Sequence, residues 1–388
     1  MNRATTILIF CVAVLLGLGM VALYSASMNM ELNQSAVGSN FLRQQLVWCA
    51  FGLAGCAAAA AVDYRRWKKI ALWLLAFSAF LLVLVYVPVI GYATKGAHRW
   101  IGLPHVPHTP RFQPSELAKL ALILFLAAYG ERHQRHMGSF KKGLAVPGAV
   151  ILAILLLIFF EPDRGCTILL AAVAGTMMVV AGVRLLYLIP PVLAAMGVLA
   201  WSLIHDPMRL TRILAWLHPE QSKGNAGYQA YEAMIAFGSG GWTGLGLGNS
   251  RQKLGGWSGF VPEHHTDFIF PIIGEELGLV TTLTVVLLFM VLVFCGVYIA
   301  RRAGDTFGLL LGTGLTFMIG IQAVINMGVV TSLLPNKGMP LPFISYGGSN
   351  LLLMLVSVGL LLSISRSATE PVRGKSNPFG ASPQLNDE

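Results

Sequence analysis

The first long apolar run of the chain decides its fold class. Residues 5–27 read TTILIFCVAVLLGLGMVALYSAS and hold no charged side chain. A helix needs about 20 apolar residues to cross the hydrocarbon of a bilayer, whereas the apolar segment of a cleaved signal peptide has roughly 7–15. The run therefore predicts a transmembrane helix that is retained as an anchor.

Further apolar stretches follow, so the sequence predicts an all-α polytopic membrane protein with about ten transmembrane helices. Hydrophobic residues make up 55% of the 388 residues and charged residues only 11%, while soluble globular chains are about 25% charged. This composition excludes a cytosolic enzyme, a disordered protein and a nucleic-acid binder, because too little polar surface is left to face water. The predicted spans are 5–27, 42–62, 69–88, 115–130, 145–160, 165–182, 186–204, 268–299, 306–330 and 347–366.

The basic residues predict the orientation of the bundle, since Lys and Arg gather in cytoplasmic loops. With the N-terminus in the cytoplasm, fifteen of the 27 Lys and Arg residues lie inside and six lie in short outer loops. We therefore expect a transmembrane domain over residues 1–367, both termini in the cytoplasm, a long extracytoplasmic loop over about 206–266, and a disordered cytoplasmic tail over 368–388.

The six outer basic residues run against the topological bias. As a group they predict an anionic ligand on the outer face, although contact with lipid phosphates would explain any one of them equally well. They are Arg43, Lys95, Arg99, Arg111, Arg164 and Lys337.

Two ionisable residues fall inside the fourth span. Glu116 and Lys119 are three residues apart, so on a helix they share a face and can pair. An ionisable residue is costly inside a membrane and is kept where it is paired or lines a wet cavity. Pro114 suits the first turn of the same helix. The pair indicates either a structural ion pair or, with Arg99 and Arg111 just before it, a cationic wall for a ligand.

The loop over 206–266 is too long for a simple connector. Residues 209–217 place Arg and Trp among Leu and Ile at helical spacing, which is typical of a helix in the headgroup plane. The glycines between Gly238 and Gly248 indicate close approach of backbone to backbone or to a bulky ligand. They do not fit a dinucleotide fingerprint, because no strand–turn–helix unit surrounds them. Residues 161–164 predict a tight turn at the surface between the fifth and sixth spans.

Asp267 ends this loop, directly before the eighth span. Thr266 or Asp267 is a natural N-cap for that helix, and this structural role is as well supported as a chemical one. In the last outer loop, residues 334–349, prolines and glycines surround Lys337 and predict a rigid turn that holds it at the mouth of the bundle. The histidines and the five cysteines show no spacing typical of a metal site.

Several stretches between the third and tenth spans together resemble the SEDS family of peptidoglycan glycosyltransferases, and its division branch more than its elongation branch. Any one stretch is weak, but the set is specific. The chain departs from the family pattern in longer connectors at 102–112 and 255–261. The matching stretches are 96–101 (GAHRWI), 113–116 (QPSE), 227–229 (GYQ), 244–250 (GLGLGNS), 252–254 (QKL), 262–263 (PE), 265–268 (HTDF) and 340–349 (PLPFISYGGS).

The resemblance implies a ten-helix fold that polymerises lipid II, a disaccharide-peptide on undecaprenyl pyrophosphate, at the outer face of the bacterial cytoplasmic (inner) membrane during septal wall synthesis. The implied partners are lipid II, a class B penicillin-binding transpeptidase and other membrane proteins of the division machinery, and no nucleic acid. Asp267 matches the essential aspartate of the family. The matching basic positions are Arg111, Lys119 and Lys337, with Glu116 as the partner of Lys119 and with Arg99 and Arg132 as weaker matches.

The chemistry of the leaving group agrees with this resemblance. Pyrophosphate departs as a stable anion and needs no acid, so one carboxylate suffices, whereas hydrolysis of a glycoside uses two. Asp267 is expected to accept the proton of the acceptor hydroxyl. Lys119, Arg111 and Lys337, with or without a divalent cation such as Mg²⁺ or Mn²⁺, are expected to stabilise the pyrophosphate. No recognisable motif binds such a cation.

Two other functions stay open at this point. A flippase for lipid II would use the same cations to guide the pyrophosphate across the bilayer, and it would need polar residues that continue through the bundle. A scaffold would only recruit the transpeptidase. The ionisable residues gather near the outer face, which favours the enzyme.

Overall fold

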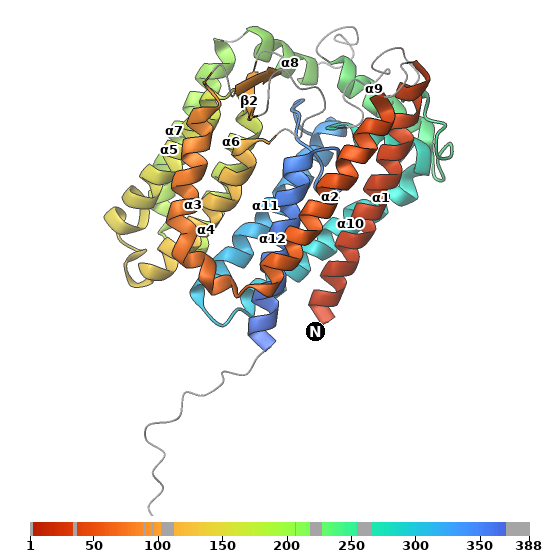
Figure 1. The fold of residues 1–388 in the computed structure, drawn as a ribbon. Coiled ribbons are helices and arrows are strands. Elements are labelled where there is room, and N and C mark those ends of the chain that lie inside the picture. The colour runs from red at the N-terminus through yellow and green to blue at the C-terminus, as the bar shows by residue number, and fades with distance from the viewer. Residues whose placement is uncertain are drawn as a thin grey trace, which may run out of the picture.

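In the part of the chain that the structure describes, ten long helices form the bundle, and their bounds follow the apolar stretches of the sequence (Figure 1). The computed structural model describes residues 3–33, 37–87, 91–94, 97–101, 112–205, 207–217, 227–253 and 266–369. The expected all-α membrane fold is confirmed, and each of the ten predicted spans corresponds to one of these helices. The helices are α1 (Arg3–Asn33), α2 (Val37–Ala61), α3 (Tyr64–Leu84), α4 (Pro114–Arg132), α5 (Val146–Phe160), α6 (Arg164–Val180), α7 (Leu185–Ile204), α10 (Ile269–Arg301), α11 (Thr306–Val330) and α12 (Gly348–Thr369).

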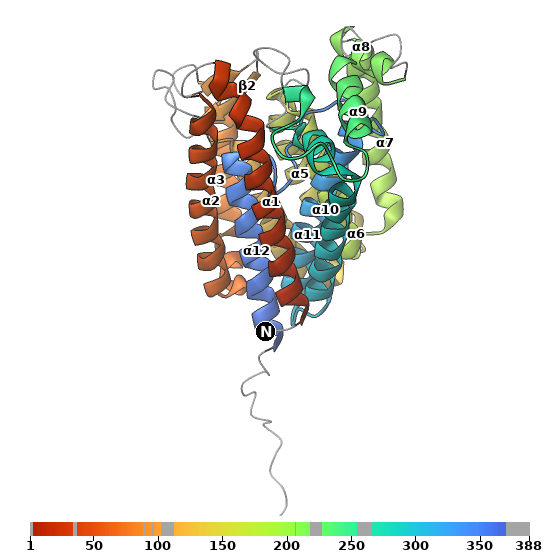
Figure 2. The ribbon, with the colours of Figure 1, turned by 90° about the vertical axis from the view of Figure 1, so that its right-hand side faces the viewer.

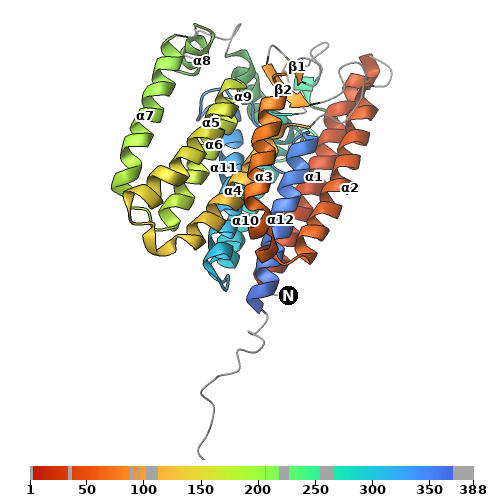
Figure 3. The same ribbon diagram turned by 60° about the vertical axis from the view of Figure 1, so that its left-hand side comes forward.

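Eight of these helices are long and apolar enough to cross a membrane, when the π-helical turn Phe140–Ala145 is counted with α5. The other two are α6, with 17 residues, and α4, whose 19 residues include the buried charges Glu116 and Lys119. The buried share of the apolar window is 78% for α12 but 6% for α7, which lies at the edge of the bundle (Figure 3).

Helices far apart in the sequence pack side by side: α2 along α12, α1 along α10, and α3 along α4. Thr5 Oγ1 and Ser365 Oγ form a hydrogen bond of 2.5 Å, so the start of α1 and the end of α12 lie at one end of the bundle (Figure 2). The even number of spans predicts this arrangement. α12 runs to Thr369, two residues into the expected tail, and residues 370–388 lie outside the described residues.

Connecting segments cover the opposite end of the bundle. An antiparallel hairpin of β1 (Gly91–Thr94) and β2 (Ala97–Ile101) precedes α4 and is a small departure from an all-α fold. In the long segment between α7 and α10, α8 (Pro207–Leu217) confirms the helix expected at 209–217, and α9 (Tyr228–Gly240) follows it. Both lie at this end (Figure 2).

Candidate functional site

The N-terminal ends of α4, α6 and α10 meet the loop between α11 and α12 (Figure 1). They do so at the end of the bundle that is covered by α8 and the β1–β2 hairpin. Local sequence sets the starts of α4 and α6. Pro114 is the first residue of α4, as expected, Asp163 is the N-cap of α6, and Phe268 occupies the N-cap position of α10. The expectation that Thr266 or Asp267 caps α10 is therefore wrong.

The ion pair expected on α4 is present and buried. Lys119 Nζ lies 2.8 Å from Glu116 Oε2, and the two side chains are 3% and 7% exposed. Burial of two charges is tolerated where further hydrogen bonds satisfy them. Asn350 Nδ2 donates to Glu116 Oε2 at 2.9 Å, and Lys119 Nζ donates to Gln322 Oε1 at 3.0 Å. The pair is thus part of a network that joins α4, α11 and α12.

Two amides of α11 extend this network to the outer loop. Gln322 Nε2 donates to the carbonyl of Pro340 at 2.9 Å. Asn326 Nδ2 donates to the carbonyl of Met339 at 2.6 Å and to the carbonyl of Asp267 at 2.8 Å. Both side chains are buried. α11 therefore fixes the position of the loop relative to Asp267.

The carboxylate of Asp267 lies against Gly338 of this loop. A Cβ atom added to Gly338 would lie 2.2 Å from Asp267 Oδ2, so only a glycine leaves room for the carboxylate there. Asp267 is partly exposed. Its backbone carbonyl is held by Asn326, and its side chain is held against the loop.

Lys337, next to Gly338, completes what we call the candidate site: Asp267 with the loop Lys337–Pro340. Lys337 is partly exposed, as the sequence predicts for a residue at the mouth of the bundle. Its Cε atom would lie 3.2 Å from a Cβ added to Gly165 in the first turn of α6. The loop thus presents an ammonium group towards α6 and meets a carboxylate from the start of α10.

Arg99 stabilises the turn between α5 and α6, next to the candidate site. Its Nε donates to the carbonyl of Glu161 at 3.1 Å, and its terminal nitrogen donates to the carbonyl of Pro162 at 2.6 Å. Asp163, the last residue of the turn, accepts from Cys166 N at 3.2 Å and from Gln113 Nε2 at 3.1 Å. The structure therefore gives Arg99 a structural use beside the site, on the α5–α6 turn.

Glu161 contradicts the expectation that this whole turn lies at the surface. Its side chain is 0% exposed, and neither carboxylate oxygen has a hydrogen-bond partner in the described part of the chain. The pKa of Glu161 is raised to about 8, mainly by burial; the charge of Asp163 also raises it, and Arg99 opposes the shift. Glu161 thus holds its proton at neutral pH.

A second buried ionic cluster fastens the glycine-rich loop. Glu276 pairs with Lys253 and accepts from Ser25 Oγ of α1 at 2.7 Å. Glu275 accepts from Ser250 Oγ and, at 3.0 Å, from Arg251 N. Leu245 N and Gly246 N donate to backbone carbonyls of α10 at 2.9 and 3.0 Å. The expected approach of backbone to backbone at these glycines is confirmed.

Other expected site residues lie elsewhere. Arg111 lies outside the described residues. Arg132 ends α4, about 27 Å along the helix axis from its start, and so lies at the far end of the bundle. Sequence reasoning missed Gln322, Asn326 and Asn350, although an amide in an apolar span is itself a signal, because it requires a partner there.

The donor set limits what metal the site could hold. The described residues include no group of three or more His, Cys, Asp or Glu side chains suited to a metal ion. The candidate site contributes one partly exposed carboxylate, that of Asp267. Mg²⁺ is commonly held by one or two carboxylates together with substrate phosphates. These residues fit a cation that binds together with a phosphate-bearing substrate.

Comparison with known sequences gives the family. The family model for cell cycle proteins of the FtsW, RodA and SpoVE group matches residues 5–370. A protein of Trichlorobacter lovleyi named probable peptidoglycan glycosyltransferase FtsW is 41% identical over 371 residues, which cover 95% of each chain. Stage V sporulation protein E of Bacillus subtilis is 36% identical over 360 residues, which cover 93% of this chain and 96% of that protein.

Solved structures share the fold over the whole bundle. A chain from a study of the structural coordination of polymerization and crosslinking by a peptidoglycan synthase complex superposes with a TM-score of 0.72 at 27% identity, covering 94% of this chain and 98% of that one. The rod shape determining protein RodA of Thermus thermophilus gives 0.65 at 26% identity and covers 94% and 97%. The chain is a multi-pass membrane protein and belongs to the family of cell cycle proteins that comprises FtsW, RodA and SpoVE.

Proposed function

We propose that this protein is a peptidoglycan glycosyltransferase that polymerises lipid II into glycan strands during septal wall synthesis. The observation that carries the proposal is that Asp267 lies against the loop that carries Lys337. Asn326 holds Asp267 and this loop together, and Gln322 ties the loop to the buried pair on α4. The names of the relatives support the reaction, and the candidate site supplies groups for it.

The donor half of the reaction requires stabilisation of a leaving pyrophosphate. Cations aimed at developing negative charge lower the barrier without transferring a proton. Lys337 is partly exposed and contacts the pyrophosphate directly. Lys119 is buried, and Glu116 and Gln322 already engage its ammonium group. Lys119 therefore acts as a positioning residue, through the Gln322 amide that holds Pro340.

The acceptor half requires removal of a proton from a sugar hydroxyl, and Asp267 accepts it. A carboxylate near the start of a helix is stabilised in its charged form and is a weak base. The hydroxyl becomes acidic once its bond to the anomeric carbon is largely formed, so correct positioning of the carboxylate matters more than its basicity. The contact with Gly338 and the hydrogen bond from Asn326 supply that positioning.

A divalent cation, Mg²⁺ or Mn²⁺, would be held by Asp267 and would supply charge neutralisation for the pyrophosphate. The proposed partners are lipid II, a class B penicillin-binding transpeptidase and other division proteins. The synthase complex among the solved neighbours supports the transpeptidase. In this proposal both termini lie in the cytoplasm, and the candidate site lies at the outer face of the inner membrane.

The flippase is the competing function, and burial of charge argues against it. A flippase needs polar groups along the whole path of the pyrophosphate. The buried ionisable side chains in the described residues all lie towards the candidate-site end: Glu116, Lys119, Glu161, Lys253, Glu275 and Glu276.

The proposal is tested with purified protein, labelled lipid II and Mn²⁺, with and without the transpeptidase, by separating glycan chains on a gel. Wild type should make polymer. Asp267→Asn, which keeps the shape of the side chain, should make none, whereas Glu232→Gln on α9 should behave as wild type. If the Asn variant loses only affinity for Mn²⁺, and high Mn²⁺ restores its rate, the base assignment is wrong and Asp267 serves only as a cation ligand.

A further inference from the structure

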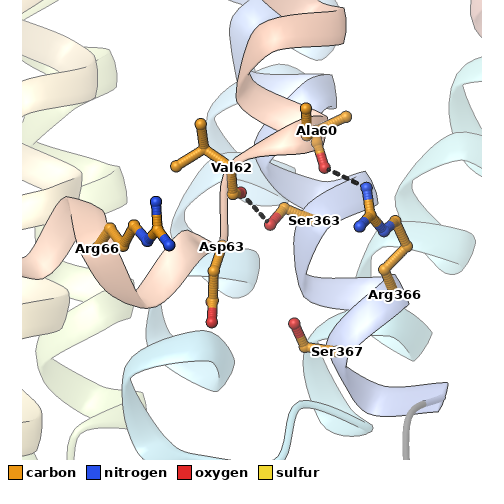
Figure 4. A pocket seen from close by; sticks show the side chains of 8 residues that line it. Ala60, Val62, Asp63, Arg66, Ser363, Arg366 and Ser367 are labelled. Carbon is orange, nitrogen blue, oxygen red and sulfur yellow. Dashed lines mark hydrogen bonds between the residues drawn. The ribbon is translucent and has the colours of Figure 1, made fainter.

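A pocket of about 270 Å³ opens at the end of the bundle opposite the candidate site (Figure 4). It lies between the α2–α3 turn and the last turns of α12, so it is remote from the proposed chemistry. The side chains that matter to its chemistry are Asp63, Arg66, Arg366 and Ser367.

Hydrogen bonds between the two elements build the pocket walls. Ser363 Oγ donates to the carbonyl of Val62 at 2.7 Å and accepts from Tyr64 N at 3.0 Å. Arg366 donates to the carbonyl of Ala60 at 3.0 Å (Figure 4). The walls are therefore formed by the fold itself, before any ligand binds.

The two arginines of the pocket differ from their neighbours Arg65 and Lys68. Arg65 pairs with Asp305 at 2.9 Å, and Lys68 pairs with Glu131. Within the described part of the chain, Arg66 and Arg366 form no ion pair, and both are exposed. A guanidinium group has five N–H donors in a planar fork that matches the oxygens of a phosphate.

Asp63 is the acidic residue of the lining, and it has a separate task. Its Oδ1 accepts from Arg65 N at 2.9 Å and caps α3. Two guanidinium groups against one carboxylate leave the lining with an excess of one positive charge. The pocket thus favours an anion with one or two charges over a neutral ligand.

An exposed apolar surface on α3, next to the pocket, indicates what kind of molecule carries the anionic group. Ile70, Trp73 and Phe77 lie four, seven and eleven residues after Arg66, so all share its face of α3. They are 46%, 76% and 52% exposed. This stripe is about 16 Å long, close to the half-thickness of the hydrocarbon core, about 15 Å. Arg66 heads an apolar stripe as long as one acyl chain.

We propose that the pocket binds the phosphate group of an anionic phospholipid, with Arg66 and Arg366 as donors and the acyl chain along the α3 stripe. A basic pocket between helices at a membrane surface is a known form of headgroup site. The shared chemistry is that of any phosphate, and the stripe commits the site to a lipid rather than to free phosphate.

The test uses the full-length protein in detergent, titrated with phosphatidylglycerol or phosphatidylcholine and followed by native mass spectrometry. Phosphatidylglycerol should bind with saturation and phosphatidylcholine should not. Arg66→Gln should weaken phosphatidylglycerol binding about fivefold, as expected for one basic residue at an anionic surface. Arg301→Gln removes an exposed arginine from the end of α10, outside the pocket, and should bind as wild type.

Two further arms separate fold from charge and lipid from free phosphate. If Arg366→Gln does not fold, Arg366→Lys takes its place as the test, because it keeps the positive charge. Arg366→Lys should retain most of the phosphatidylglycerol binding. Inorganic phosphate at millimolar concentration should not displace the lipid. Equal binding by Arg66→Gln and wild type, or displacement by phosphate alone, would overturn the proposal.

Discussion

Gly338 decides where the carboxylate of Asp267 lies, because a side chain there would take its place. Gly338→Ala adds a Cβ 2.2 Å from Asp267 Oδ2, and the carboxylate must move. A shift of about 1 Å in a reacting group can cost on the order of 100-fold in rate. We expect kcat for lipid II polymerisation to fall by about that factor, with little change in the unfolding temperature.

Gly347 of the same loop is the matched control for this prediction. A Cβ added there meets its nearest neighbours at 3.6 and 3.9 Å, which is ordinary contact. Gly347→Ala should polymerise lipid II at the wild-type rate. A Gly338→Ala variant as fast as Gly347→Ala would show that the position of the Asp267 carboxylate does not limit the reaction.

Glu161 makes the stability of the protein depend on pH. Its pKa is raised from 4.5 to about 8, so above pH 4.5 the carboxyl ionises in the unfolded chain while the folded protein still binds the proton. The contribution of Glu161 to stability is therefore complete below pH 4.5, is lost as the pH rises to about 8, and changes little above that.

Glu161→Gln removes this titration, and thermal unfolding in detergent across a pH series measures the effect. The unfolding temperature of the variant relative to wild type should rise between pH 5 and about 8 and then level off. Glu232→Gln, at a partly exposed site on α9, should show no such trend. A constant difference between Glu161→Gln and wild type over this range would contradict the raised pKa.

At the scale of elements, the kink in α10 ties the glycine-rich loop to the helix that follows Asp267. Gly278 has φ 78° and ψ −178°, and a Cβ there would lie 2.4 Å from the carbonyl oxygen of Trp242. Gly278→Ala combines backbone strain with a clash. It should lower the free energy of unfolding by about 1–3 kcal/mol, measured by chemical or thermal unfolding.

A glycine in open space gives the comparison. Gly175 lies inside α6, and an added Cβ would meet nothing within 4 Å. Gly175→Ala should unfold at or above the wild-type temperature, because alanine favours a helix over glycine by about 1 kcal/mol. If both variants unfolded alike, the kink would not be a point of strain.

The spans and the α4 pair could be predicted because their causes are local. Hydropathy marks each helix, and a spacing of three residues places Glu116 and Lys119 on one face. The start of α10 could not be predicted by capping rules. Asn326 of α11 holds the carbonyl of Asp267, and the helix begins at Ile269. A contact with a residue distant in the sequence thus fixes the backbone just before the helix, and the N-cap residue Phe268 makes no side-chain hydrogen bond.

The candidate site was only partly predictable for the same reason. Asp267 and Lys337 stand out in the sequence by charge, but the closeness of Asp267 to the loop depends on Gly338, Gln322 and Asn326, whose roles appear only once α11 is placed. Amide side chains are uncharged, so a search of the sequence for charged residues does not find them.

Across the whole molecule, the distribution of buried charge separates a polymerase from a flippase. Buried ionisable side chains lie at the candidate-site end among the described residues, and the opposite half of the core is lined by apolar and hydroxyl side chains. A pyrophosphate that entered this half would have to shed its water without a cation to receive it, which is prohibitively costly in hydrocarbon. Lipid II is therefore expected to react at one face without crossing.

Reconstituted vesicles with lipid II in only one leaflet, Mn²⁺ and the transpeptidase test this expectation. Polymer should form only when lipid II and the candidate site face the same side, and Asp267→Asn should abolish it. Labelled lipid II in the opposite leaflet should cross no faster than in protein-free vesicles, because the apolar half of the core offers its pyrophosphate no buried charged partner among the described residues. Fast crossing without polymer would instead require a charged path that opens during transport, and the flippase would then replace the polymerase as the function of this chain.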